Sequence, residues 1–177
     1  MRKGRWSTPE ARYFVTCCVV RPSSALMHGD CPQDLRRTIS RLHEDGDIAL
    51  HCAGVMPDHV HILFTLGARL SLGRVVSKLK GLTAETVRLA GAAWQANFFE
   101  HRLRPEEERD PYARYIFMNP YRAGLLRRQE KWPGWFHTAE NPPAFVSMLE
   151  EGIYPPAAWL DEMPEEMGLD AAVLGEV

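Results

Sequence analysis

The pattern of hydrophobic and polar positions along the chain predicts three strands and a fourth segment that is a strand or an extended loop. Residues 12–20 are rich in β-branched and aromatic side chains, and residues 48–56 and 59–66 share this character, so all three ranges are expected to be strands. A short link separates the second range from the third, which favours a β-hairpin. Residues 94–103 are aromatic and are expected to form a fourth strand or an extended loop.

Apolar residues recur at helical spacing in 32–45 and 70–89, and this spacing predicts two amphipathic helices. A third helix is expected over 106–126, with a kink or an end near Pro120, because proline lacks a backbone donor and biases the preceding residue away from helical angles. The order β-α-β-β-α-β-α predicts an α+β fold, a ferredoxin-like antiparallel sheet with helices packed on one face. After Lys131 the chain is expected to be irregular with short helical pieces.

Composition and charge divide the 177 residues into two parts. Hydrophobic residues make up 45% and charged residues 25%, which is typical of a globular protein. Residues 138–177 hold nine of the 23 acidic residues and no Lys or Arg, so residues 1–137 carry all 21 basic residues and a net charge of +7. We therefore expect a basic body over 1–137 and an acidic, proline-rich C-terminal extension. An Arg-rich body suits a polyanionic partner, although a normally solvated surface would have the same composition.

The sequence also limits the cellular setting. It contains no apolar run of about 18 residues, so no transmembrane helix is expected. The basic N-terminal segment is not followed by an apolar core and a small-residue cleavage site, which argues against a secretory signal. The four cysteines show no CxxC spacing and are expected to be reduced thiols in a cytoplasmic protein.

The first chemical feature is the segment MPDHVHIL, at residues 56–63. Side chains alternate between the two faces of a strand, so His59 and His61 share one face while Val60 and Ile62 point into the core. Two imidazoles about 7 Å apart on one strand face can converge on a divalent metal ion. Two histidines on a solvated strand face would show the same spacing.

A second feature follows in the third helix, where Tyr115 and Asn119 are four residues apart and are therefore neighbours on one helix face. A tyrosine beside an amide oxygen could supply a nucleophile and a third metal ligand together. A core aromatic residue and a polar residue before Pro120 would give the same pattern.

Three segments in order, MPDHVHILF, WQANFFEHRLR and YARYIFMNPYRAGLL, closely resemble the REP-associated tyrosine transposases, which are single-tyrosine HUH transposases. HUH denotes His, a bulky apolar residue and His, here residues 59–61. The resemblance implies that 1–137 is a metal-dependent single-stranded DNA endonuclease and strand transferase. Such enzymes cut beside an imperfect palindromic hairpin and form a 5′-phosphotyrosine. Tyr115 would be the nucleophile, and His59, His61 and Asn119 would bind Mg²⁺ or Mn²⁺.

The resemblance also implies the partners: single-stranded DNA with imperfect palindromic hairpins, no membrane, and a chain that acts as a monomer or a homodimer. Basic residues near the three segments are the expected phosphate contacts, namely Lys78, Lys80, Arg102, Arg104, Arg122 and Arg127. Trp6, Trp94 and Phe99 could stack on bases, although core packing is the more common role of such residues. His101 could contact a phosphate or stabilise the end of its strand.

Two other functions are alternatives for these motif residues. A histidine-triad nucleotide hydrolase needs a third alternating histidine, but position 63 is leucine. A non-catalytic single-stranded nucleic-acid binding module of ferredoxin-like fold stays open as the alternative function. Asp58 stands before the first histidine where the family also commonly has asparagine, and no functional weight is given to this difference.

Overall fold

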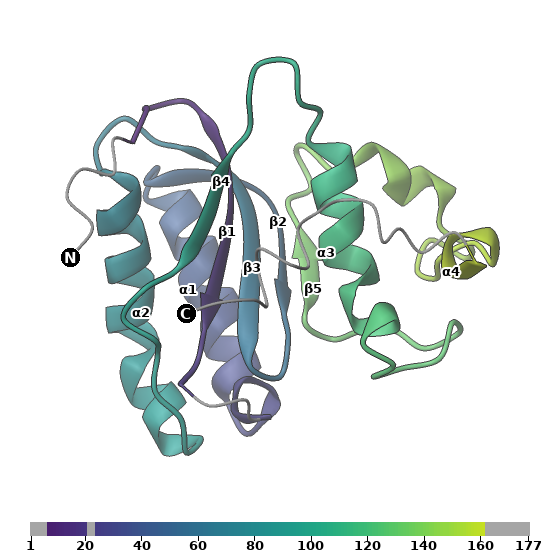
Figure 1. Cartoon of the computed structure of the whole chain (residues 1–177), viewed down its shortest axis with the longest axis horizontal. Helices are drawn as coiled ribbons and strands as arrows, with labels where there is room; N and C mark the ends of the chain where they lie inside the picture. The colour runs from purple at the N-terminus through teal and green to yellow at the C-terminus, as the bar shows by residue number, and fades with distance from the viewer. Residues whose placement is uncertain (1–6, 21–23, 162–177) are drawn as a thin grey trace.

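Five strands form one antiparallel sheet in the computed structural model, which describes residues 7–20 and 24–161. The strand order is β4-β1-β3-β2-β5 (Figure 1). The strands are β1 (Arg12–Cys18), β2 (Ile48–Val55), β3 (His59–Leu66), β4 (Phe99–Arg102) and β5 (Trp135–His137). Neighbouring strands are antiparallel, and the first four have the order of a ferredoxin-like sheet, so the predicted α+β fold is confirmed.

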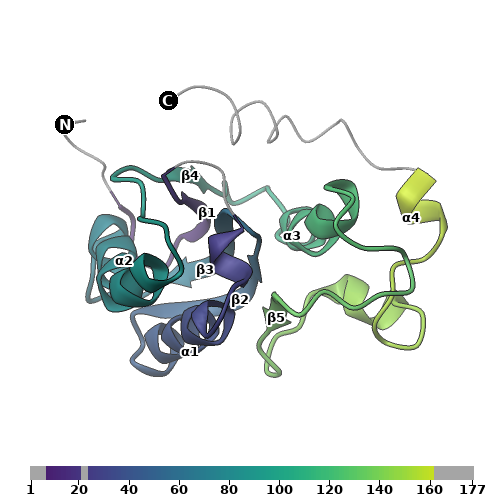
Figure 2. The same ribbon diagram turned by 90° about the horizontal axis from the view of Figure 1, so that it is seen from below.

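Helices cover both faces of this sheet. Figure 2 shows α1 (Cys31–Glu44) and α2 (Leu72–Leu89) on one face and α3 (Asp110–Arg122) on the other. The prediction that the helices pack on one face is therefore wrong for α3. Shorter helical segments are η1 (Ala25–Met27), η2 (Ala144–Met148) and α4 (Ala158–Asp161). Within the described ranges, none of the helices combines the length and the apolar character needed to cross a bilayer.

The larger core lies between the sheet and the pair α1 and α2. Val60 and Ile62 of β3 are buried in it, as the alternation along the strand predicts, and Leu35, Ile39 and Leu79 meet them from the helices. Burying one such side chain completely stabilises the fold by about 1.5–3 kcal/mol. This face of the sheet is therefore the structural base from which the opposite face presents its side chains.

The smaller core lies under α3. Phe14 and Leu63 from the sheet pack there with Ile116 of α3 and with Phe145 and Trp159 from the C-terminal segment. The segment up to residue 161 is thus packed against α3. Residues 162–177 of the expected acidic extension lie outside the described residues.

Two local features differ from the pattern-based expectation. Helix α3 is shorter than the expected range 106–126, because it begins at Asp110 and ends at Arg122, near Pro120 as expected, where backbone bonds from Ala123 to Asn119 and from Leu125 to Pro120 close its last turn. Strand β5 falls in a segment expected to be irregular, and at three residues it is too short to show an alternation.

Candidate active site

His59 and His61 lie side by side on the face of β3 that α3 covers. Their Nε2 atoms are 3.0 Å apart and their ring centroids 4.5 Å apart. This is closer than their spacing along the strand, because the two rings turn toward each other. His61 is completely buried and His59 nearly so, which makes the pair part of the interior rather than a solvated strand face.

Asp58 and Thr16 orient the two rings. Asp58 Oδ1 lies 2.7 Å from His59 Nδ1, and because an ionised carboxylate can only accept, Nδ1 donates and Nε2 of the neutral ring keeps its lone pair. The same bond lowers the pKa of the Asp58 carboxyl. Thr16 Oγ1 lies 2.8 Å from His61 Nδ1, opposite it in the pairing of β1 with β3. When Nδ1 donates to this hydroxyl, the lone pair of His61 Nε2 faces that of His59.

Burial, with a smaller contribution from neighbouring His59, holds the pKa of His61 well below its usual range. The ring of His61 is therefore neutral at neutral pH. A neutral imidazole whose second nitrogen is held by a hydrogen bond is the form that ligates metal ions. The pair thus offers two nitrogen ligands to one point.

Helix α3 brings Asn119 and Tyr115 to the same place. Asn119 Nδ2 lies 3.2 Å from His61 Nε2, and turning the amide would present its oxygen there instead. The buried Tyr115 ring packs edge-on against His61 at a centroid distance of 5.5 Å and against Phe14 at 5.9 Å. The Arg122 guanidinium lies over the Tyr115 ring, 5.1 Å from its centroid. The four residues singled out by their spacing therefore form one cluster.

The residues of this cluster determine which side chain could be the third protein ligand of a metal ion. Within residues 7–20 and 24–161, no three His, Cys, Asp or Glu side chains are grouped so that they could hold a metal ion. A cation between His59 and His61 would therefore take its third protein ligand from a neutral oxygen, and Asn119 is the amide at that position. A phenol beside such a cation suits nucleophilic attack on a phosphodiester.

Lys78 and Lys80 are placed elsewhere. Both belong to α2, on the sheet face opposite α3 (Figure 2). Lys78 Nζ donates to Asp45 at 2.9 Å and to Asp47 at 2.6 Å. Lys80 Nζ donates to the carbonyls of Gln95 and Asn97, each at 2.7 Å. Both ammonium groups hold segments of the fold together, and their expected contacts with DNA stay predictions.

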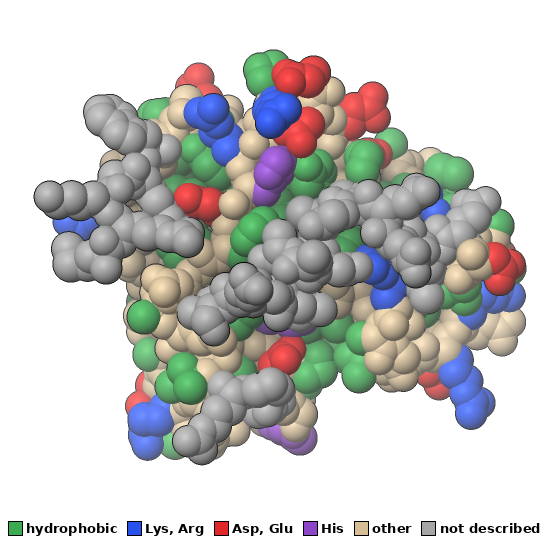
Figure 3. All heavy atoms as spheres, in the orientation of Figure 1, with side chains coloured by type: hydrophobic (Ala, Val, Ile, Leu, Met, Phe, Trp, Pro, Cys, Tyr) green, Lys and Arg blue, Asp and Glu red, His purple; other side chains and the backbone are tan. Residues whose placement is uncertain are grey.

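The remaining expected DNA contacts come from segments around α3. Arg102 donates to Thr8 at 2.9 Å, Arg104 and Arg127 are exposed, and only Arg122 reaches the Tyr115 ring. On the face drawn in Figure 3, acidic and basic side chains are interspersed over the visible surface. The roles of these residues in DNA binding stay predictions.

The described aromatic candidates, Trp94 and Phe99, are partly buried and pack against the two cores. The Trp94 indole donates to Thr83 at 3.0 Å, and Phe99 packs against Phe14 at a centroid distance of 6.4 Å. Trp6 lies outside the described residues.

A polar cluster that the sequence did not reveal fastens the link between β4 and α3. Tyr112 donates to Glu107 Oε1 at 2.9 Å, and His101 Nε2 lies 3.0 Å from the same oxygen. Burial, then the bond to Glu107, raises the pKa of Tyr112 to about 12. Tyr112 is thus held as a hydrogen-bond donor, which leaves Tyr115 as the tyrosine of α3 that packs against the histidine pair. Asp58 was recognisable by its position beside His59, whereas nothing in the sequence pointed to Thr16.

The comparisons with known proteins agree with this arrangement. Residues 11–104, more than half of the chain, match the sequence model of the family described as "Transposase IS200 like". The chain therefore belongs to the IS200-like transposase family.

Two further comparisons show which transposases the chain is similar to. The REP-associated tyrosine transposase of Escherichia coli (strain K12) is 26% identical over 125 residues, which cover 70% of each chain. A solved structure of a REP-associated tyrosine transposase bound to a REP hairpin has a TM-score of 0.62 at 24% identity and covers 88% of each chain. The resemblance seen in the three sequence segments is thereby confirmed, and the solved structure shows the same fold. The family match ends before α3, so Tyr115 and Asn119 lie beyond it.

Proposed function

We propose that this protein is a metal-dependent single-stranded DNA endonuclease and strand transferase that acts beside palindromic hairpins through a 5′-phosphotyrosine on Tyr115. One observation carries the proposal: the Tyr115 ring packs against His61, whose Nε2 faces both His59 Nε2 and the Asn119 amide. The hairpin is proposed because a relative of the same fold was solved bound to a REP hairpin.

The donor set fits a divalent cation. Two ligand atoms at right angles, each about 2.1 Å from one ion, would be about 3.0 Å apart, which matches the separation of the two Nε2 atoms. His59 and His61 would hold the ion with the Asn119 amide oxygen. Two imidazoles are softer ligands than carboxylates, so Mn²⁺ should bind better than Mg²⁺. When bound, the ion would draw charge from the attacked phosphate and lower the barrier to displacement.

The side chains of the protein would perform the remaining steps. The Tyr115 hydroxyl releases its proton to solvent and its oxygen forms a bond to phosphorus, while the bond to the DNA 3′-oxygen breaks and that oxygen takes up a proton. Arg122 lies over the Tyr115 ring, from where its positive charge would stabilise the charge that develops on the attacked phosphate. The phosphotyrosine is still a diester, so a second 3′-hydroxyl can attack it, release Tyr115 and join two strands.

A non-catalytic single-stranded nucleic-acid binding module is the competing function. Such a module needs no oriented imidazoles. In this chain Asp58 and Thr16 each hold one Nδ1 atom, so that both Nε2 atoms face one point beside Tyr115. This orientation favours the enzyme, because metal-binding histidines are held by such partners.

Covalent capture of DNA separates the two functions. The purified chain is incubated with Mn²⁺ and a hairpin that carries unpaired flanks and a label at its 3′ end, and a denaturing gel then detects labelled protein. We expect an adduct with the wild type, none with Tyr115→Phe, and an adduct with Tyr112→Phe, the matched control on the same helix. His59→Ala should abolish the adduct and keep hairpin binding. Hairpin binding without any adduct in Mn²⁺ or Mg²⁺ would instead establish the binding module.

A further inference from the structure

We propose that a cleft on the far flank of α3, between β5 and residues 146–153, binds an unpaired nucleotide of the DNA strand. This inference rests on the proposed function, because it assigns part of the same substrate to a second place on the protein. Except for Arg36, the residues that line the cleft lie beyond those that match the transposase family.

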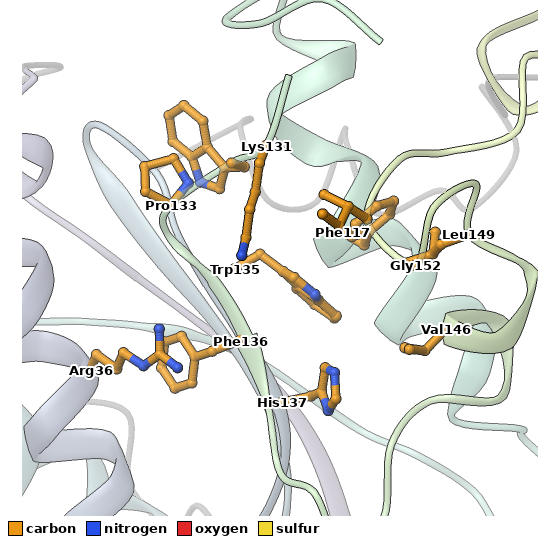
Figure 4. A pocket seen from close by; sticks show the side chains of 12 residues that line it. Arg36, Phe117, Lys131, Pro133, Trp135, Phe136, His137, Val146, Leu149 and Gly152 are labelled. Atoms are coloured by element: carbon orange, nitrogen blue, oxygen red, sulfur yellow. The ribbon is translucent and has the colours of Figure 1, made fainter. Parts of the chain in front are cut away.

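Aromatic side chains form the walls of this cleft, whose volume is about 560 Å³. Trp135 and His137, alternate residues on one face of β5, line one side, and Phe117 of α3 and Leu149 line the other (Figure 4). Pockets that hold small ligands typically measure about 300–1,000 Å³, so a nucleotide fits the available space. Bases stack on aromatic rings with little dependence on sequence.

The cleft and the candidate active site lie on opposite flanks of the same helix. Tyr115 contacts Phe14 and His61 of the sheet, whereas Phe117 contacts Trp135 of β5 at a centroid distance of 5.4 Å. A helix with its side chains is about 10 Å across. A single strand cut at Tyr115 therefore needs only a few nucleotides to reach the cleft around α3.

Two cations give the cleft its charge. Arg36 lies over the Phe136 ring, 5.0 Å from its centroid, and Lys131 lines the same cleft. Both side chains are exposed, and neither forms an ion pair with any residue in 7–20 or 24–161. No acidic residue is among the described residues that line the cleft. Arg36 and Lys131 therefore place positive charge where phosphates that flank a bound base could contact it.

The backbone of β5 adds polar groups along the cleft. The bonds from Val55 N to Gly134 O, at 3.0 Å, and from Thr138 N to His51 O, at 3.4 Å, show that even-numbered residues pair with β2. Peptide groups of the alternate residues, Trp135 and His137, therefore point to the outer edge of the sheet. The Trp135 N–H donates to the Trp132 carbonyl at 3.4 Å, so the carbonyls of Trp135 and His137 and the His137 N–H are the groups that can bond to the edge of a base. A peptide could use the same edge, but the cations Arg36 and Lys131 beside aromatic rings favour a nucleic acid.

Gly134 allows this wall to form. A Cβ atom at this position would lie 2.3 Å from the Val55 carbonyl oxygen and 2.6 Å from Trp132 Nε1. Only glycine lets β5 come so close to β2 while the Trp132 indole donates to the Val55 carbonyl at 2.8 Å. The aromatic wall is therefore fixed in place by close packing.

The test compares two double variants on defined DNA. Arg36→Gln/Lys131→Gln removes both cations of the cleft, and Arg37→Gln/Arg41→Gln removes two exposed cations of α1 that do not line it. The probes are a blunt hairpin and the same hairpin with an oligo(dT) extension on its 5′ or its 3′ side. We expect the cleft variant to bind one extended hairpin about 10-fold more weakly than the wild type. The slope of the logarithm of its binding constant against the logarithm of the salt concentration should be smaller by about 1.4, because each single-strand phosphate contact contributes about 0.7. The cleft variant should bind the blunt hairpin like the wild type. The control variant should bind every probe like the wild type.

Photocrosslinking locates the extension. Iodouracil placed in the oligo(dT) segment should crosslink to the peptide that contains Trp135. A wild-type chain that binds blunt and extended hairpins equally, or a crosslink that maps only to other segments, would overturn the cleft assignment while the proposed function stands. A wild-type chain that binds none of the hairpins would overturn the proposed function and this inference with it.

Discussion

The Asn119 amide lies 3.2 Å from Nε2 of His61, although the two residues are 58 positions apart in the chain. This contact joins the last turn of α3 to the central strand β3. It is the point at which the helix that carries Tyr115 meets the histidine pair. The candidate metal site is thus assembled from two elements that fold against each other.

Replacing Asn119 with alanine should weaken Mn²⁺ binding about 10-fold, because the cation would lose its neutral oxygen ligand and keep only His59 and His61. Titration calorimetry of the purified chain measures this change directly. Asn141→Ala, at an exposed position away from the site, should bind Mn²⁺ like the wild type. An unchanged affinity in Asn119→Ala would remove this residue from the ligand set.

Asp58 should act through the His59 ring. Asp58→Ala removes the acceptor that holds His59 Nδ1, and a loss of about 10- to 100-fold in Mn²⁺ affinity is expected. Asp58→Asn keeps an oxygen acceptor, so this variant should lose Mn²⁺ affinity only a few-fold. Electron paramagnetic resonance of free Mn²⁺ can rank the two variants beside Asp30→Asn, an exposed control. Equal affinities in Asp58→Ala and the wild type would contradict this positioning role.

Gly54 should be needed for the approach of α3 to the sheet. Gly54 lies opposite His61 in the sheet, and a Cβ atom there would lie 2.6 Å from Ile116 Cγ2. Gly54→Ala should therefore lower the free energy of unfolding by about 1–3 kcal/mol. It should also reduce adduct formation by displacing Tyr115.

Gly81→Ala is the matched control for this substitution. Gly81 is exposed inside α2 and has open space around it. Alanine at this position should raise the free energy of unfolding by up to about 1 kcal/mol, because alanine favours helix more than glycine does. Urea denaturation compares both variants with the wild type. A Gly54→Ala chain as stable as Gly81→Ala would show that α3 does not depend on this close approach.

His51 should make stability depend on pH. Burial, with the nearby charge of Arg109, lowers the pKa of His51 to about 4 from an ordinary 6.5. The folded state thus favours the neutral ring, so its stabilising effect is complete above pH 6.5 and declines as the pH falls toward 4. The loss by pH 4 approaches about 3 kcal/mol.

The difference between the wild type and His51→Gln isolates this contribution, because glutamine can still bond to Thr65 and does not titrate. Between pH 7 and 4, the free energy of unfolding should fall further in the wild type than in the variant. Parallel curves for the two proteins would contradict the assignment.

Much of the fold could be predicted because its elements have regular patterns. The expected range 59–66 coincides with β3, and the helices over 32–45 and 70–89 begin and end within two residues of α1 and α2. The motif residues could be found because the alternation of a strand and the four-residue spacing of a helix each place two side chains on one face. The burial of His61 could not be predicted, because it depends on α3 covering the face of β3 that carries this residue.

The missed features depend on contacts between distant segments. Thr16 reaches His61 only through the register of β1 against β3, which the sequence of β1 does not encode in any motif. The bonds of Lys78 to Asp45 and Asp47 depend on how α2 packs beside the end of α1, whereas its expected contact with DNA stays a prediction.

The hydrogen bonds that join β5 to β2 also connect the proposed nucleotide cleft with the candidate active site. Val55 is bonded both to Gly134 and to the Trp132 indole, and Met56 N donates to the His59 carbonyl. Tension on a strand anchored at the outer edge would thus be transmitted along a short stretch of backbone to the first imidazole.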